Sequence, residues 1–145
     1  MTRKSGFALS EVLVLVVLLG IMASLIVPHI SGVNADSKTS TLATELRRMR
    51  NRIESYRSHH NGQFPATTGE NFTDFLRRMA KKTNADGDAG IEFGPYVLRL
   101  PVNPFNDSST VRIDGAVAGA NIAGWRFDTI TGAFQADDSP NHAMF

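Results

Sequence analysis

The stretch Gly6-Phe7-Ala8-Leu9-Ser10-Glu11, with the apolar run that follows it as far as Val27, decides how this chain is built. Between Phe7 and Val27 the only ionisable side chain is that of Glu11. A helix rises about 1.5 Å per residue, so roughly 20 apolar residues cross a hydrocarbon core of about 30 Å. Each valine, leucine or isoleucine favours insertion by about 0.3–0.6 kcal/mol, and together they outweigh one carboxylate. We therefore expect a transmembrane helix over residues 7–30.

The carboxylate of Glu11 needs an explanation, because an acid beside an apolar run is costly unless it stays solvated or is paired. One interpretation places Glu11 at the level of the lipid headgroups, in contact with water. The other assumes that the chain is cut after Gly6, which gives Phe7 a free ammonium group. Glu11 then pairs with that ammonium, in the same chain or in a neighbouring one.

The spacing of several residues around this run is specific. They are Arg3, Lys4, Gly6, Phe7, Glu11, Gly20 and Pro28. In this arrangement the chain resembles type IV pilins and type II secretion pseudopilins, and most of all the major, G-type pseudopilins. The resemblance implies that a prepilin peptidase cuts after Gly6 and methylates Phe7. It also implies that Glu11, at the fifth position after the cut, serves filament assembly.

A different leader is conceivable, because Val33-Asn34-Ala35 has the small residues of an ordinary signal-peptidase site. Ordinary signals, however, have apolar cores of about 7–15 residues and no acid between the basic end and the core. We therefore expect a cleaved leader over residues 1–6, a transmembrane and polymerisation helix over 7–30, and a periplasmic domain over 31–145.

The position of the first basic residues predicts how the chain is oriented in the membrane. Arg3 and Lys4 precede the apolar run, and the next base is Lys38. The positive-inside rule then places the N-terminus in the cytoplasm and the C-terminal domain outside a single-pass inner-membrane anchor. The chain of 145 residues contains no cysteine, so it cannot form the C-terminal disulfide of many type IV major pilins. This favours the pseudopilin branch of the family.

The helical pattern continues beyond the apolar run. An apolar stripe recurs at spacings of four and three residues, formed by Leu42, Leu46, Met49, Ile53 and Tyr56. We expect one helix from about Phe7 to His60, kinked or locally unwound between Gly20 and Pro28, and ending at Asn61-Gly62. A second helix is expected to begin at Asn71, a good N-cap residue.

The C-terminal part shows strand signals. Alternating residues predict strands over 110–113, 122–127 and 133–136, the last two joined by a five-residue loop from Asp128 to Gly132. The segment from Gly94 to Phe105 is extended, and the alternation of Tyr96, Leu98 and Leu100 predicts one face that packs down. The tail from Asp137 has no pattern and is expected to be mobile. The predicted fold is α+β and pilin-like, a long helix packed against a small antiparallel sheet.

No catalytic set is recognisable, so we expect a protein that is not an enzyme. The sequence lacks a cysteine nucleophile, Gly-x-Ser-x-Gly, a glycine-rich phosphate loop and His-Glu-x-x-His. His59 and His60 are interpreted as surface residues at a helix end. Calcium binding is a feature of the major pseudopilins that the chain resembles, but their metal loop is not recognisable. The acids of residues 84–90 lack the spacing of an EF-hand. We therefore expect no cofactor, with calcium as the alternative.

Charge is unevenly distributed. Residues 38–82 carry ten bases and four acids, a net charge of +6, whereas residues 83–145 carry three bases and eight acids, a net charge of −5. This separation suits head-to-tail packing of identical subunits, although two ordinary solvated surfaces would look the same.

The resemblance implies a structural subunit of a periplasmic pseudopilus in type II secretion. Its partners are then copies of itself, other pseudopilins, the prepilin peptidase, and an inner-membrane platform protein and ATPase. The alternative is a type IV pilus subunit for adhesion, motility or DNA uptake. In that case an arginine stripe would bind phosphates, formed by Arg47, Arg48, Arg50, Arg52 and Arg57.

Overall fold

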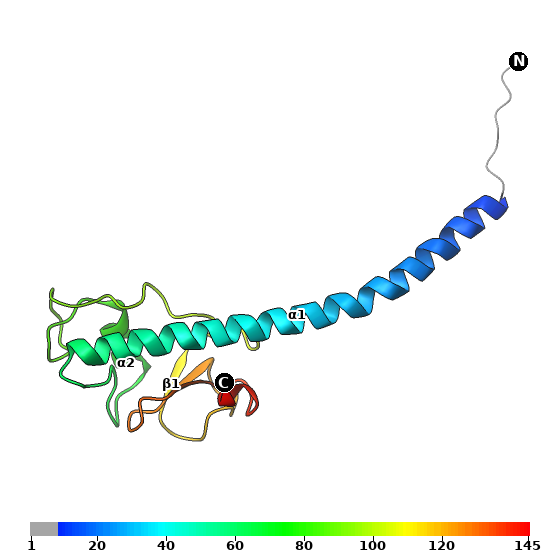
Figure 1. Ribbon diagram of the computed structural model, residues 1–145. Helices are drawn as coiled ribbons and strands as arrows, with labels where there is room; N and C mark the ends of the chain where they lie inside the picture. Colours follow the sequence, from blue (N-terminus) through cyan, green and yellow to red (C-terminus); the bar gives the residue numbers. More distant parts are fainter. Residues whose placement is uncertain (1–8) are drawn as a thin grey trace, which may run out of the picture. The chain divides into compact units, whose positions relative to one another are not determined.

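The computed structural model describes the backbone of residues 9–145 and the side chains of residues 9–21 and 34–145. The chain forms two compact units that meet between Ser37 and Lys38, and helix α1 belongs to both. The elements in order are α1 (Leu9–His59), α2 (Phe72–Ala80), β1 (Val111–Ile113), β2 (Trp125–Phe127), β3 (Phe134–Ala136) and the short 3₁₀ helix η1 (His142–Met144) (Figure 1). The unit from Lys38 to Phe145, called the head below, has the predicted α+β composition.

Helix α1 is assigned without interruption over 51 residues. The local unwinding predicted between Gly20 and Pro28 is therefore not found. Proline removes one backbone hydrogen bond and its ring crowds the carbonyl of the preceding turn, but its fixed φ is compatible with a helix that continues on both sides. The predicted end is confirmed: Asn61 and Gly62 have φ of 55° and 82°, and Gly62 N–H donates to the carbonyl of Arg57 at 2.9 Å.

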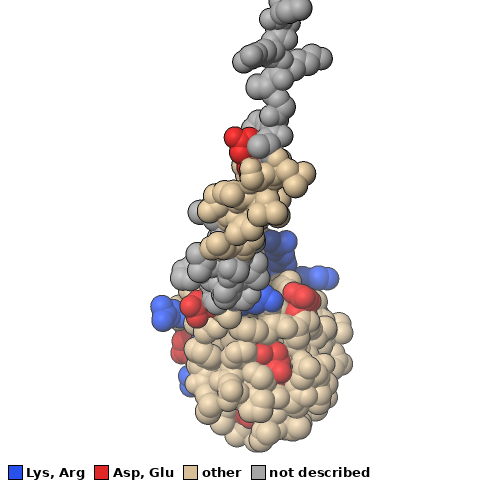
Figure 2. Space-filling view, turned by 90° about the vertical axis from the view of Figure 1, so that its right-hand side faces the viewer, with Lys and Arg blue, Asp and Glu red and all other residues tan. Residues whose placement is uncertain are grey.

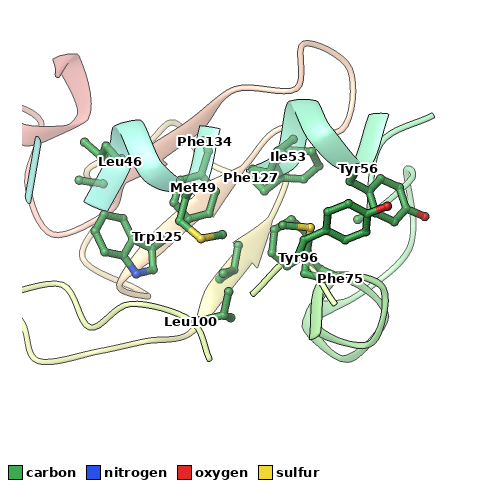
Figure 3. Packing of buried hydrophobic residues seen from close by; sticks show 14 of the residues in the cluster. Leu46, Met49, Ile53, Tyr56, Phe75, Tyr96, Leu100, Trp125, Phe127 and Phe134 are labelled. Carbon is green, nitrogen blue, oxygen red and sulfur yellow. The ribbon is translucent and has the colours of Figure 1, made fainter. Parts of the chain in front are cut away.

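The core of the head forms on the predicted stripe of α1. Figure 3 shows this stripe facing aromatic residues of the sheet and of α2. The buried members of the core include Leu42, Leu46, Met49, Ile53 and Tyr56 from α1, Phe75 and Met79 from α2, and Trp125, Phe127 and Phe134 from β2 and β3. The amphipathic half of α1 is thus covered by its own chain.

Helix α2 begins where the sequence predicts. The side chain of Asn71 accepts a hydrogen bond from Thr73 N–H at 2.8 Å, and Asp74 accepts one from the backbone N–H of Asn71 at 3.2 Å. This reciprocal capping box satisfies N–H groups that a helix start leaves without partners. Phe75 and Met79, one turn apart, then point to the core.

The sheet differs from the prediction, because it is mixed rather than antiparallel. Strand β1 pairs with β2 in parallel, and β2 pairs with β3 in the antiparallel direction through the predicted loop 128–132. The connection over residues 114–124 is long enough to return the chain to the starting end of β1, so β2 runs in the same direction. Periodicity alone could not reveal this direction.

The extended segment after Gly94 packs down only in part. Tyr96 and Leu100 are buried as predicted, and Tyr96 OH lies 3.0 Å from Nδ1 of His59 on α1. Leu98, predicted on the same face, is 94% exposed. The chain turns around Leu98 and Arg99, which breaks the alternation that a regular strand would maintain.

The tail is fixed rather than mobile. Asp137 is completely buried, and η1 places Ala143 against the head. Gln135 donates to the carbonyl of Ala143 at 3.0 Å, and Arg50 of α1 donates to the carbonyl of Phe145 at 2.6 Å. These contacts join residues that are distant in sequence, so no local pattern announces them.

An ion pair ties the segment before α2 to α2 itself. Arg78 donates to both carboxylate oxygens of Glu70, at 2.5 and 2.8 Å. The hydrogen bond from Arg78 lowers the pKa of Glu70 to about 2, more than offsetting the opposite effect of burial. The ionised pair therefore stabilises the folded head at neutral pH.

We predict that Ile53→Ala, in the head core, lowers the free energy of unfolding by roughly 2–5 kcal/mol, because it leaves a cavity. Ile53 is 3% exposed, whereas Ile130 is 83% exposed. Ile130→Ala is the matched control, and a surface change of this kind costs about 0.5 kcal/mol or less. Urea unfolding measures both variants. Equal costs would mean that Ile53 is not core.

We predict that Glu70→Gln destabilises the head at pH 7 by an amount on the order of 2 kcal/mol. Because the folded pKa is about 2, below the ordinary 4.5, the contribution of Glu70 is present above pH 4.5 and is lost as the pH falls toward 2. The difference from wild type should therefore shrink over this window in urea unfolding. Glu54→Gln, which removes an exposed carboxylate, is the control. A difference that does not change with pH would contradict the prediction.

Candidate functional site

The N-terminal part of α1 exposes apolar side chains around its whole circumference. The exposed fractions of its large apolar residues run from 51% to 88%. These residues are Leu9, Val12, Leu13, Val14, Leu15, Val16, Val17, Leu18, Leu19 and Ile21. A helix that is apolar on all sides is stable only when lipid or other helices cover it. This part of α1 is therefore the first candidate for an assembly surface.

Glu11 lies in the first turn of α1 with an exposed side chain. A carboxylate is favoured there, since the N-terminal end of a helix carries partial positive charge. Gly6 and Phe7, the predicted cleavage and methylation residues, and the leader with Arg3 and Lys4 lie outside the described residues. The pairing of Glu11 with a Phe7 ammonium group stays a prediction.

Within the described residues, no helix has the length and apolar character of a membrane span. Of the span predicted over residues 7–30, residues 7–8 and the side chains of 22–30 lie outside the described part.

The five arginines of the possible phosphate-binding stripe do not form one surface. At 100° per residue, Arg48 and Arg52 face one way on α1, and Arg50 and Arg57 face another. Arg48 pairs with Glu45 at 2.9 Å, and Arg57 pairs with Glu54 at 3.5 Å.

Arg50 donates to the carbonyl of Phe134 at 3.0 Å as well as to that of Phe145, so it is occupied in holding the C-terminal part of the head. The side of the head shown in Figure 2 is largely uncharged, and no continuous basic track crosses it. These observations weaken the case for a DNA-binding pilin.

A groove lies between α1 and the segment 95–102, with a volume of about 620 Å³. Arg48, Arg52 and Arg99 line it, together with Glu45 and the apolar Val102. The excess of positive charge makes this groove a candidate contact for an acidic surface.

The sequence predicts surface positions for both His59 and His60. For His60 this prediction is wrong. His60 is 1% exposed and its ring stacks on that of Tyr56. Its Nδ1 lies 2.7 Å from the carbonyl oxygen of Tyr56, and its Nε2 lies 2.9 Å from Oγ1 of Thr83. A carbonyl only accepts, so Nδ1 carries a proton. Both ring nitrogens are used to join α1 to the loop that follows α2, which is a structural role.

The described residues contain no group of three His, Cys, Asp or Glu side chains arranged to hold a metal ion. In the loop 84–90, the side chain of Asn84 accepts from the N–H groups of Asp86 and Asp88, at 3.1 and 2.9 Å. This contact forms a local turn of the kind that asparagine favours. The carboxylates of Asp86 and Asp88 stay exposed.

Comparison with known proteins decides the family. The type II secretion system core protein G of Aeromonas hydrophila is 33% identical to this chain over 105 residues, which cover 72% of this chain and 70% of that protein. The chain belongs to the type II secretion system core protein G family. Members from Vibrio cholerae and Klebsiella pneumoniae are 29% and 28% identical over 107 and 106 residues. No family model and no solved structure matches the chain.

In this member of the core protein G family, the ion pairs of the described residues stay within one or the other of the two charged segments of the head. Within the described residues, each ion pair joins two residues of the basic segment 38–82 or two residues of the segment 83–145. The second group includes Arg112 with Asp137 and Arg126 with Asp128, both largely buried. Among the residues that the structure describes, no ion pair between the two segments offsets their opposite net charges.

Sequence reasoning missed the contact of Arg112 with Asp137, which orders the longest connection of the sheet in this family member. The two residues are 25 positions apart. Arg112 lies between Val111 and Ile113 in a short strand, where an arginine suggests only an outward-facing position. No local signal marked either residue.

Proposed function

We propose that this chain is a structural subunit of the periplasmic pseudopilus of a type II secretion system, and that it assembles through its hydrophobic N-terminal helix. The observation that carries the proposal is the 33% identity to a core protein G over most of both chains. The exposed apolar surface of residues 9–21 supports it, because a subunit that polymerises through this helix keeps the surface available for its neighbours.

Maturation follows from the N-terminal motif. A prepilin peptidase removes residues 1–6 and methylates Phe7. The new chain stays in the inner membrane through residues 7–30, with its N-terminal end toward the cytoplasm and the head in the periplasm. The run with one ionisable residue and the basic Arg3 and Lys4 ahead of it support this topology.

Assembly then depends on Glu11. In a bundle of identical helices the Phe7 ammonium group enters a low-dielectric layer, where an unpaired charge costs several kcal/mol and a matched pair recovers much of that cost. Glu11 of a neighbouring subunit reaches this group when helices are staggered by about one turn, roughly 5 Å. The pair fixes the axial register of the incoming subunit.

The heads add a second contact between copies. Their segments of opposite net charge are not neutralised by ion pairs between them among the described residues, and the groove beside α1 is lined by three arginines. Complementary charges direct the orientation of association more than they add affinity. Other pseudopilins, the inner-membrane platform protein and its ATPase complete the set of partners.

We predict that the mature protein begins at methylated Phe7. Mass spectrometry of the membrane-extracted chain gives its N-terminal residue and its modification directly. A mature terminus at Asp36, after Val33-Asn34-Ala35, would identify an ordinary signal peptide and contradict the proposed function.

We predict that Glu11→Gln leaves a folded, membrane-inserted protein but reduces filament formation and secretion at least tenfold, which corresponds to about 1.4 kcal/mol of lost register energy. Glu54→Gln removes an exposed carboxylate elsewhere on α1 and should assemble normally. Both variants are compared at matched protein levels. Normal assembly of Glu11→Gln would show that Glu11 is only a solvated residue at the membrane edge.

A further inference from the structure

The connection between β1 and β2, residues 114–124, is ordered although it buries no large apolar side chain. Val117 and Ile122 are 82% and 66% exposed, and only the small Ala123 is buried among its apolar side chains. Four of its residues have positive φ: Asp114, Gly115, Gly119 and Asn121. For the two that are not glycine, Asp114 and Asn121, this backbone is costly and persists only when the surroundings determine it. With no large apolar side chain buried, polar contacts supply that order.

The guanidinium of Arg112 donates hydrogen bonds to backbone carbonyl groups of this connection. One of its NH₂ groups donates to the carbonyls of Asp114 and Ala116, both at 2.7 Å, and the other donates to that of Val117 at 3.2 Å. Three backbone oxygens thus converge on one positive charge. Arginine suits this role, since its planar fork offers five donors.

Asp137 completes the arrangement from the other side. Its side chain is 0% exposed and accepts from Arg112 at 2.7 and 3.3 Å. Four backbone N–H groups of the connection donate to the same carboxylate, at 3.1 to 3.3 Å, and they belong to Gly119, Ala120, Ile122 and Ala123. Burial alone would raise the pKa of Asp137, but the bonds from Arg112 and these N–H groups lower it.

The oxygen atoms around Arg112 do not fit as ligands of a calcium ion. Calcium binding is a feature of the major pseudopilins that this chain resembles. Calcium takes six to eight oxygen ligands at about 2.3–2.6 Å. Here the carbonyls of Ala116 and Val117 and the carboxylate of Asp137 are already used. The carboxylate of Asp114 accepts from N–H and Oγ1–H of Thr129 at 2.8 and 2.7 Å. The guanidinium would also repel a second cation at this place.

We propose that Arg112 is a built-in cation of the head, which orders the β1–β2 connection in place of a metal ion and makes the fold independent of calcium. The guanidinium supplies the positive charge, the backbone carbonyls surround it, and Asp137 neutralises it. Because the charge is covalently attached, the order of this connection does not vary with the calcium concentration around the head.

The first experiment uses the full chain in detergent micelles, with thermal unfolding followed by circular dichroism in excess EGTA and in millimolar calcium chloride. A ligand that binds the native state raises the midpoint with its concentration. We expect the same midpoint in both solutions. A saturable rise of the midpoint with calcium would overturn the proposal. This result does not depend on secretion, so it is separate from a failure of the proposed function.

The second experiment compares Arg112→Ala with Arg47→Ala, which removes an exposed guanidinium from α1 of the same head. We expect Arg112→Ala to lower the unfolding midpoint by roughly 10 °C or more, and Arg47→Ala to change it by about 2 °C or less. Elastase should cleave Arg112→Ala faster than wild type within residues 114–124, which mass spectrometry of the fragments reveals. Unchanged stability and cleavage in Arg112→Ala would overturn the proposal.

Arg112→Lys separates the charge from its geometry. A lysine ammonium keeps the positive charge but lacks the fork that spans three carbonyls and Asp137. We expect its midpoint and its rate of cleavage to lie between those of wild type and Arg112→Ala. A lysine variant no better than alanine would contradict a role for the cationic charge. If Arg112→Ala does not fold, this variant and the calcium titration of wild type still decide the proposal.

Discussion

The apolar side chains along α1 must be covered, and the rest of the structure depends on this constraint. In the head, the stripe that includes Leu46 and Ile53 is buried under the sheet and α2, so this half of the helix is stabilised by its own chain. Residues 9–21 expose apolar side chains on every side, and no segment of one chain can cover a full circumference and leave the helix accessible to neighbours. One helix therefore combines a folding surface with a surface for lipid or other subunits.

Inside the head, the apolar core and the buried charges have different tasks. The core positions α1, α2 and the strands, because burial of apolar area is strong but not directional. Ion pairs fix the connections between these elements, and most donors and acceptors of these pairs have hydrogen-bond partners. Examples are Arg78 with Glu70 and Arg112 with Asp137. A buried pair recovers its desolvation cost only when its remaining bonds are made, which ties each pair to one conformation of its loop.

Membership in the core protein G family gives these features a common use. A structural subunit of a secretion system needs a head of defined shape, together with surfaces that contact other components of the system. Because the ion pairs of the described residues lie within its two segments, the segments of the head keep opposite net charges. The arginine-lined groove beside α1 concentrates positive charge at one place on the head. Complementary charges of this kind orient partners during association more than they add affinity.

The sequence by itself determined the features that depend on neighbouring residues. The stripe of α1, its end at Asn61-Gly62, the cap at Asn71 and the loop from Asp128 to Gly132 follow from helical spacing, backbone conformation and local hydrogen bonds. The family motif is equally local, since it lies in a single run of the chain.

Only the tertiary structure decided the parallel direction of β1 and β2, the exposure of Leu98 and the burial of His60 and Asp137. The strand direction and the two burials depend on contacts between residues far apart in the chain, and Leu98 is exposed because the chain bends there. None of these features is encoded in the spacing of residues along one segment.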